Sequence, residues 1–344
     1  MKILLLGGTV FLGHHLVEAA FARGHEITLF NRGVHRSHVS SPVEELRGNR
    51  RSDLSSLRGR HWDAVIDTSG YVPSLVQASA RLLADVVKQY VFISSISVYS
   101  DFRTVGMDET GPVGTLTLEQ VQEAEQRMPS DNGVIAQDYG EMYGPLKALC
   151  EQAVSKTMPG RVLTIRPGLI VGPYDYSDRF TYWPRRVAQG GEVLAPGRPE
   201  RPIQYIDARD LAEWIIQMIE REQNGVYHAT QPASHLTMQH VVEACKTVSE
   251  SDATFTWLSD SFLLEQGVQP WSQLPLWLPE EEDSAGFLSL NVQKALSAGL
   301  TFRPVETTVR ETLLWDAHRS PQEKLYAGLD PEQEKRVLYA WHHR

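Results

Sequence analysis

The 344-residue chain has little cysteine, no long apolar run and no excess of basic residues. Its two cysteines, Cys150 and Cys245, fall in segments predicted to be helical, so neither a disulfide framework nor a zinc site is expected. This cysteine usage fits a reducing compartment such as the cytoplasm. The apolar run Ile3–Leu6 is too short for a signal peptide or a membrane span, and no membrane association is expected. The net charge of -10 disfavours a nucleic-acid partner, which requires a basic surface.

The chain instead shows short apolar segments that alternate with amphipathic ones. We expect strands at residues 2–6, 26–30, 62–67, 90–94 and 161–166, and helices at residues 14–23, 75–87 and 143–156. Strands that alternate with helices predict an α/β fold with a doubly wound parallel sheet. One more strand is expected within residues 32–60.

A glycine-containing turn, GGTVFLG, follows the first strand. Gly7, Val10 and Gly13 occupy the three positions of a G-x-x-G-x-x-G pattern, in which Gly7 allows the tight turn and Gly13 allows close helix–strand packing. Backbone N–H groups at the helix start then face a pyrophosphate. A tight turn without a ligand is the alternative, but the flanking strand and helix favour a Rossmann-type dinucleotide site. Val10 replaces the middle glycine and narrows the approach to the phosphates.

The end of the second strand bears on the choice between NAD(H) and NADP(H). A carboxylate there would bind the ribose 2′-hydroxyl of NAD, but this chain has Asn31 and Arg32. A cation suits a 2′-phosphate, so NADP(H) is favoured over NAD(H), with a solvated arginine as the alternative. His35 and Arg36 could assist, and Asn49 and Asp53 lie where a group that contacts adenine could sit.

Tyr143 and Lys147 form a Y-x-x-x-K pair in a predicted helix, so both side chains point to the same face. A nearby ammonium favours phenolate, which would lower the pKa of the tyrosine toward working pH and prepare it for proton exchange with a substrate oxygen. Ser94, Ser95 and Ser97 lie at the carboxyl end of the strand YVFIS, where ligands bind in doubly wound sheets.

Five segments together give the chain a family resemblance over residues 1–230: GGTVFLG, FISSISVYS, YGPLKALCE, TIRPGLIVGP and IQYIDARDLAEW. The chain resembles extended or atypical short-chain dehydrogenases/reductases of the NAD-dependent epimerase/dehydratase family. The GGT-x-F start and the strand ending in NRG are similar to an isoflavone-reductase-like subgroup, which also resembles the chloroplast stem-loop-binding proteins. The middle glycine is absent, and the gap between Ser95 and Tyr143 is unusually long because of an insertion at residues 101–140.

The resemblance implies roles for individual residues. Ser95, with Ser97 as the second choice, completes a catalytic triad with Tyr143 and Lys147, and Lys147 also holds the nicotinamide ribose. Residues implied to contact the dinucleotide are Gly7, Thr9, Val10, Phe11, Leu12, Gly13, Asn31, Arg32, Thr68, Ser69, Gly70, Ser94, Tyr143, Lys147, Pro167 and Gly168. A homodimer is a further expectation at family level.

We divide the chain at residue 168. Residues 1–168 are predicted to form the NADP(H)-binding Rossmann domain, interrupted by the insertion, which carries a helix near residues 116–127. Residues 169–344, rich in proline, glycine and tryptophan, are predicted to form a smaller α/β substrate-binding region, parts of which pack back on the sheet.

An aromatic and basic cluster follows the sequence VGPYD. Tyr174, Arg179 and Trp183, together with Ser97, are candidate substrate contacts, with the arginine for an anionic group. A helix start that packs on the core is the alternative. Asp207 is expected to cap a helix, and the segment 271–282 to pack on the core rather than to form a lid.

These features predict an NAD(P)-dependent oxidoreductase or epimerase that acts on a carbonyl or alcohol carbon of a small or nucleotide-sugar-like molecule. Tyr143 is the proposed acid and base, and no metal is expected. Ser97 and Val98 occupy positions where sugar dehydratases that resemble this family carry carboxylates, which favours a reductase or an epimerase. A non-catalytic NADP(H)-binding or RNA-binding protein on the same fold is the alternative, but such a protein need not keep the triad.

Overall fold

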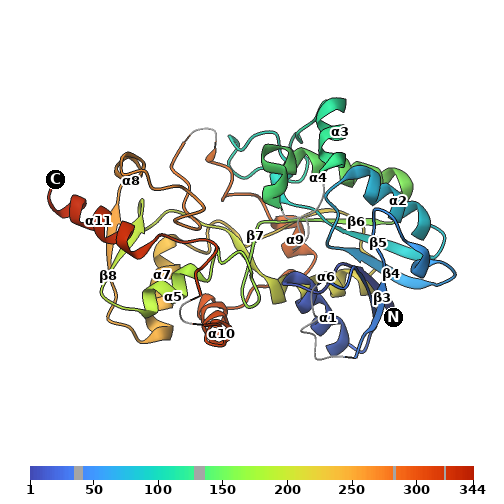
Figure 1. Ribbon diagram of the computed structural model, residues 1–344, viewed down its shortest axis with the longest axis horizontal. Coiled ribbons are helices and arrows are strands. Elements are labelled where there is room, and N and C mark those ends of the chain that lie inside the picture. The colour runs from blue at the N-terminus through green and yellow to red at the C-terminus, as the bar shows by residue number, and fades with distance from the viewer. Residues whose placement is uncertain (35–41, 128–135, 282–283, 321–322) are drawn as a thin grey trace.

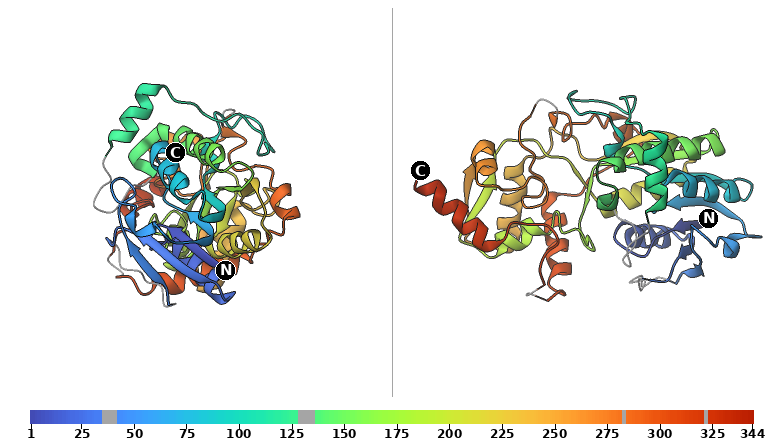
Figure 2. Two further views of the ribbon diagram at one scale, coloured as in Figure 1. Left: turned by 90° about the vertical axis from the view of Figure 1, so that its right-hand side faces the viewer. Right: turned by 45° about the horizontal axis from the view of Figure 1, so that its top comes forward.

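The computed structural model describes residues 1–34, 42–127, 136–281, 284–320 and 323–344. Figure 1 shows an elongated molecule, with the central sheet and its helices at one end and α5, α7, α8 and α11 at the other. The N-terminus lies in the first part and the C-terminus at the far end of the second, as the right-hand view of Figure 2 also shows.

The central sheet has seven parallel strands in the order β10-β6-β5-β4-β1-β2-β3. These strands are β1 (Lys2–Leu6), β2 (Glu26–Asn31), β3 (Glu44–Arg47), β4 (Trp62–Asp67), β5 (Val87–Ile93), β6 (Val162–Pro167) and β10 (Gly225–Ala229). The doubly wound α/β fold is thus confirmed, and β3 is the strand expected within residues 32–60. The strand order reverses between β1 and β4, and ligands bind at the carboxyl ends of strands beside such a reversal.

Helices cover both faces of this sheet. Helices α1 (Leu12–Ala22) and α6 (Ala208–Glu220) pack on the face that receives Ile3 and Leu5, and α2 (Pro73–Leu83) and α4 (Tyr143–Thr157) pack on the face that receives Leu4 and Leu6. The strict alternation of these side chains along β1 explains why the segment is apolar on both faces. Helix α2 ends four residues before the expected end at Val87, because Val87 already pairs with Trp62 in the sheet.

A separate hydrophobic cluster forms the core of the second part of the molecule, around Trp183, Trp277 and Val241. Its elements are α5 (Tyr182–Ala188), β8 (Glu192–Pro196), α7 (Met238–Ser249), β11 (Thr254–Leu258), α8 (Asp260–Glu265), α10 (Val305–Asp316) and α11 (Pro331–His342). Two short parallel pairs accompany it, β8 with β11, and β7 (Leu169–Val171) with β9 (Tyr205–Asp207). Strand β10 lies in the central sheet and α6 packs on it, although both follow elements of the second part in the chain. The chain therefore passes between the two parts more than once. A domain boundary at residue 168 stays a prediction.

The described residues of the insertion, 101–127 and 136–140, contain α3 (Leu118–Gln126) and most of the 3₁₀ segment Ala136–Met142, which packs against α4. Arg51, from the loop after β3, donates hydrogen bonds to the carbonyl oxygens of Glu125 (2.8 Å) and Arg127 (2.7 Å) at the end of α3. The insertion is therefore attached to the loop that follows β3. Within the described residues, no helix is long and apolar enough to cross a membrane, and no group of three potential metal ligands is found.

His15 connects the first helix to the second part of the molecule. Its Nε2 lies 3.0 Å from the carbonyl oxygen of Pro173, in the loop after β7, and the side chain is buried. Burial lowers the pKa of His15 from 6.5 to about 4, and the hydrogen bond to Pro173 only partly offsets this. The imidazole is therefore neutral in the fold near pH 6, whereas it is partly charged in the unfolded chain.

This difference predicts an acid-sensitive contribution to stability. Below pH 6.5 the unfolded chain binds a proton at His15 that the folded chain does not, so stability falls until the pH reaches about 4. The free energy of unfolding contributed by this residue should be about 2 kcal/mol smaller at pH 5 than at pH 7. Urea unfolding of wild type and His15→Gln checks this, because glutamine retains a donor but does not titrate. Parallel pH profiles for the two proteins would refute the assignment.

Candidate active site

The glycine loop joins β1 to α1 with backbone packed against backbone. Gly7 has φ 102°, and a Cβ there would lie 2.6 Å from Oγ1 of Thr68. A Cβ on Gly13 would lie 2.3 Å from Cα of Gly8, so glycine is obligatory at the first helical turn. Val10, at the position of the middle glycine, is 45% exposed. The loop thus has glycine at the positions that pack against neighbouring residues, and a valine side chain at the position that faces solvent.

A pocket that is partly open to solvent lies beside this loop. Its lining residues are Gly7, Thr9, Phe30, Asn31, Arg32, Gly33, Val34, Gly48, Asn49, Arg50, Arg51, Ser69, Tyr71, Val72, Leu75 and Tyr139. Several residues expected at the dinucleotide therefore share one pocket, whereas Asp53 does not line it. The candidates His35 and Arg36 lie outside the described residues.

The end of β2 supplies two residues to the pocket, Asn31 and Arg32. The side-chain oxygen of Asn31 accepts a hydrogen bond from the backbone N–H of Gly33 (2.7 Å), and its buried Nδ2 has no partner among the described residues. Arg32 is exposed and, among the described residues, forms no ion pair. An amide donor and a free guanidinium thus stand side by side, which suits a phosphorylated ribose.

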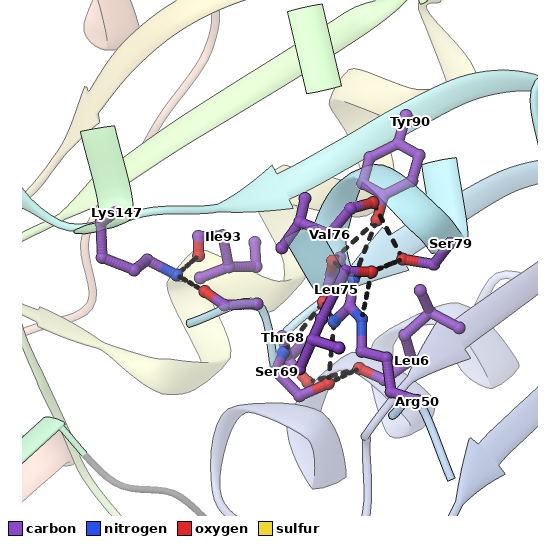
Figure 3. A network of polar contacts seen from close by, with 12 residues as sticks. Leu6, Arg50, Thr68, Ser69, Leu75, Val76, Ser79, Tyr90, Ile93 and Lys147 are labelled. Atoms are coloured by element: carbon purple, nitrogen blue, oxygen red, sulfur yellow. Dashed lines mark hydrogen bonds and ion pairs between the residues drawn. The ribbon is translucent and has the colours of Figure 1, made fainter. Parts of the chain in front are cut away.

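Arg50 and Asp67 form a buried ion pair at the inner wall of the pocket. Figure 3 shows Arg50 among its neighbours Ser79 and Tyr90. Nη1 of Arg50 donates to Oδ1 of Asp67 (2.7 Å), Nη2 donates to the hydroxyl of Ser79 (2.7 Å), and the hydroxyl of Tyr90 donates to Oδ2 of Asp67 (2.7 Å). Burial alone would raise the pKa of Asp67, but the charge of Arg50 brings it below the ordinary value. The pair joins the loop after β3 to the end of β4.

Lys147 lies one helical turn after Tyr143 and is buried beneath the sheet edge. Its ammonium donates to the carbonyl oxygens of Gly70 (2.8 Å) and Ile93 (2.6 Å), as Figure 3 shows for Ile93, and lies 4.4 Å from the ring centre of Phe92. Burial lowers its pKa from 10.5 to about 8. The lysine therefore links α4 to the ends of β4 and β5.

Tyr143 is held against Ser95 by a close approach of α4 to the segment after β5. A Cβ on Gly144 would lie 1.9 Å from the carbonyl oxygen of Ser97, so only glycine permits this contact. Burial raises the pKa of Tyr143, and a hydrogen bond with Ser95 and the charge of Arg179 only partly offset it. The expected lowering of this pKa by Lys147 is therefore wrong in direction, because burial of the phenol outweighs the charges around it.

The hydroxyl of Ser95 has a second role in its own loop. It accepts a hydrogen bond from the backbone N–H of Ser97 (3.1 Å) and lies 3.1 Å from the Ser97 hydroxyl. Ser94 contributes a buried hydroxyl that has no hydrogen-bond partner in the described ranges. Ser95 thus lies between Ser97 and Tyr143, and Ser94 offers an unused polar atom at the carboxyl end of β5.

The other residues expected along the dinucleotide lie at the carboxyl ends of β4 and β6. The hydroxyls of Thr68 and Ser69 donate to the carbonyl oxygen of Leu6 (3.1 and 3.2 Å). Pro167 ends β6, and Gly168 lies so close to Thr230 that a Cβ would meet its Oγ1 at 2.7 Å. These residues border the same edge of the sheet as the glycine loop.

Of the remaining substrate candidates, Arg179 is the one near Tyr143. Tyr174 packs instead on His14 at the start of α1, with ring centres 4.1 Å apart. The assignment of Trp183 to a substrate wall is wrong, because its side chain is fully buried in the second core and its indole N–H donates to the carbonyl oxygen of Pro275 (2.8 Å). The alternative expected for this segment, a helix start that packs on the core, describes Trp183.

Sequence reasoning missed three contributors to the site: Gly144, Tyr71 and the Arg50–Asp67 pair. Tyr71 lies between Lys147 and Tyr143, with its ring centre 5.4 Å from the ammonium and 6.2 Å from the tyrosine ring. The sequence held one indication of the role of Asp67, because a carboxylate at the end of a buried strand needs a partner. It held none for the other residues, because their roles arise from contacts distant in the chain.

The fit of a dinucleotide to this edge rests on three features: a loop in which a Cβ on Gly7 or Gly13 would clash, the unpartnered polar atoms of Asn31 and Ser94, and the pocket. The model of the NAD dependent epimerase/dehydratase family matches residues 3–229. The chain belongs to this family. The match covers the sheet from Ile3 onward, together with the glycine loop, Ser95, Tyr143 and Lys147.

Curated relatives of this family member are distant. A bovine (Bos taurus) epimerase family protein, SDR39U1, is 24% identical over 265 residues, which cover 72% of this chain and 80% of the relative. The chloroplast stem-loop binding protein of 41 kDa b from Arabidopsis thaliana is 24% identical over 262 residues, 71% of this chain and 62% of the relative. A 2-alkyl-3-oxoalkanoate reductase from Stenotrophomonas maltophilia is 26% identical over 219 residues, 62% and 64% of the two chains.

Solved structures share the fold of this family member. The human SDR39U1 structure with NADPH superposes with a TM-score of 0.58 at 19% identity and covers 91% of this chain and 99% of that one. UDP-glucose 4-epimerase from Bifidobacterium longum, in complex with NAD+ and UDP, gives 0.60 at 16% identity and covers 92% and 98%.

The contact at Gly144 generates a prediction about stability. Gly144→Ala should reduce the free energy of unfolding by about 1–3 kcal/mol, because the new methyl group meets the carbonyl of Ser97 and α4 must shift. Urea unfolding measures the change. Gly24→Ala is the control, since a Cβ there meets nothing within 4 Å and only the positive φ of 77° is strained. An equal or smaller loss for Gly144→Ala would refute the packing argument.

Proposed function

We propose that the protein is an NAD(P)(H)-dependent oxidoreductase or epimerase of the short-chain dehydrogenase/reductase type. The observation that carries the proposal is the pairing of Tyr143 with Ser95 at the sheet edge that also carries the glycine loop. The substrate is a small molecule or a nucleotide sugar with a reactive carbonyl or alcohol carbon. The likeness to a protein named a reductase and to proteins named epimerases supports this reading.

The residues that would hold the dinucleotide follow the sheet edge. The loop Gly7–Gly13 would hold the pyrophosphate, Asn31 and Arg32 the phosphorylated ribose, and Lys147 the ribose of the nicotinamide. When bound, a reduced nicotinamide supplies a hydride to a carbonyl carbon. NADP(H) is proposed as the preferred cofactor because Arg32 is a free cation where NAD-binding proteins carry a carboxylate.

Tyr143 handles the proton. Because burial raises its pKa, the side chain is a phenol at neutral pH and so donates its proton to the substrate oxygen in the direction of reduction. Ser95 orients that oxygen through its hydroxyl. Lys147 keeps α4, and hence Tyr143, in place through its bonds to Gly70 and Ile93.

A non-catalytic protein that binds NADP(H) or RNA is the second candidate, and the likeness to the chloroplast stem-loop binding protein favours it. The net charge of -10 and the Tyr143–Ser95 pair favour the enzyme. A gel-shift titration with a structured RNA and a scan for NADPH oxidation with carbonyl compounds separate the two. A homodimer and a cytoplasmic location remain proposals.

Tyr143→Phe tests the catalytic assignment. Turnover of any carbonyl compound that the wild type reduces should fall about 100- to 10,000-fold, because the proton donor is removed while the ring remains. The dissociation constant for NADPH, followed by cofactor fluorescence, should stay unchanged. Tyr339→Phe, on an exposed tyrosine of α11, is the control. Unchanged turnover in Tyr143→Phe would overturn the mechanism.

Arg32→Ser tests the cofactor assignment. The dissociation constant for NADPH should rise about tenfold, because a charge-assisted contact to the 2′-phosphate is lost, whereas that for NADH should not change. Arg58→Ser, an exposed arginine outside the pocket, is the control. If the wild type binds NADH as tightly as NADPH, the preference for NADP(H) is wrong.

A further inference from the structure

The loop at residues 172–181, between β7 and α5, borders the sheet edge that carries Tyr143. At its start, Nε2 of His15 lies 3.0 Å from the carbonyl oxygen of Pro173. Toward its end, the carboxylate of Asp178 accepts hydrogen bonds from Nη1 of Arg319 (2.5 Å) and from the backbone N–H of Tyr326 (2.9 Å). The loop is therefore held from both sides, by α1 and by the segment that follows α10.

A relay inside this loop orients Arg179. The hydroxyl of Ser177 donates to Oδ1 of Asp175 (2.6 Å), and Nε of Arg179 donates to that hydroxyl (3.0 Å). Asp175 is 1% exposed, and its Oδ2 has no hydrogen-bond partner within the part of the chain that the structure describes. Burying a carboxyl group with one oxygen that accepts no hydrogen bond costs free energy, so a native structure that keeps one calls for an explanation. Here it holds Ser177, and through Ser177 the guanidinium, in one orientation.

The guanidinium of Arg179 is available to a ligand. In the part of the chain that the structure describes, it forms no ion pair and no hydrogen bond other than that to Ser177. The side chain is partly exposed, and its charge acts on Tyr143, whose pKa burial raises and Arg179 lowers. Two terminal nitrogens that share one plane match the two oxygens of a carboxylate.

The other cations described around this loop are already paired. Arg319 binds Asp178 and Glu323, and Arg185 binds Asp316. Among the described residues around this loop, Arg179 is therefore the cation that forms no ion pair. A single positive charge suits a monoanion better than the diphosphate of a nucleotide sugar. Two exposed rings stand near: Tyr176 is 54% exposed and Tyr326 is 63% exposed. They offer apolar surface to the body of a ligand.

We propose that the substrate is an oxo acid with an apolar body, whose carboxylate pairs with Arg179 while its carbonyl oxygen faces Tyr143 and Ser95. The proposal rests on the function proposed above and specifies its substrate class. Arg179 determines specificity, and Asp175 and Ser177 are positioning residues that act through it.

The test uses 2-oxo and 3-oxo acids of increasing chain length, their methyl esters, and UDP-glucose as probes. NADPH binding is titrated first by fluorescence, then each probe is titrated into the NADPH complex, and oxidation of NADPH is followed by absorbance. In the wild type, acids should exceed their esters in kcat/KM by about 100-fold. Arg179→Gln should lower kcat/KM for acids by about 100-fold, mainly through KM, and lower that for esters by a much smaller factor, because esters lose only the effect of the arginine charge on Tyr143. Ser177→Ala should shift KM for acids in the same direction by a smaller factor.

The matched control is Arg58→Gln, which should change neither substrate preference nor NADPH binding. Esters turned over as well as acids, a preference for UDP-glucose, an equal loss for acids and esters in Arg179→Gln, or no binding of any acid to the NADPH complex would each overturn the proposal and leave the proposed function intact. Absence of NADPH and NADH binding in the first titration would instead show that the proposed function itself fails.

Discussion

The buried ammonium of Lys147 is the interaction on which the rest of the site depends. A charged group that is 3% exposed is unfavourable unless its hydrogen bonds are made, and here the carbonyls of Gly70 and Ile93 accept two of them. Those carbonyls lie at the ends of β4 and β5, so one side chain aligns two strands with α4. The position of Tyr143 follows from that alignment. Lys147 is not among the main groups that shift the pKa of Tyr143, whereas its hydrogen bonds fix the helix that carries the tyrosine.

Close backbone contacts complete the alignment. Gly144 brings α4 onto the carbonyl of Ser97, Gly13 brings α1 onto Gly8, and Gly168 brings the end of β6 onto Thr230. Each contact would be lost with one added methyl group, because protein interiors have no room for it. The tolerance of Val10 has the same explanation, since its side chain meets solvent instead of backbone. A side chain in place of the middle glycine of the family pattern is thus permitted, because the loop does not pack against other residues at that position.

A second buried polar network ties the insertion to the sheet. Arg166 on β6 pairs with Glu151 of α4 (2.7 Å), and its Nη1 donates to the hydroxyl of Tyr99 (2.8 Å) and to the carbonyl of Glu109 (3.0 Å) within the insertion. Tyr99 in turn contacts His228 on β10. Because partly satisfied buried charges are costly, such a network specifies one arrangement of these segments. The long inserted segment is therefore compatible with a well-defined site.

Local patterns in the chain were sufficient for the strands, for most helix positions and for the glycine loop, because periodicity and turn chemistry act within a few residues. The helix bearing Tyr143 and Lys147 and the cap at Asp207 were predictable for the same reason. The burial of Trp183, the direction of the shift in the pKa of Tyr143 and the free state of Arg179 were not, since each depends on which distant segments surround the side chain. The sequence by itself determined a doubly wound sheet with a Tyr–Lys pair at its edge. Only the tertiary structure decided which charges are paired and which remain for a ligand, because pairing is a matter of distance in space.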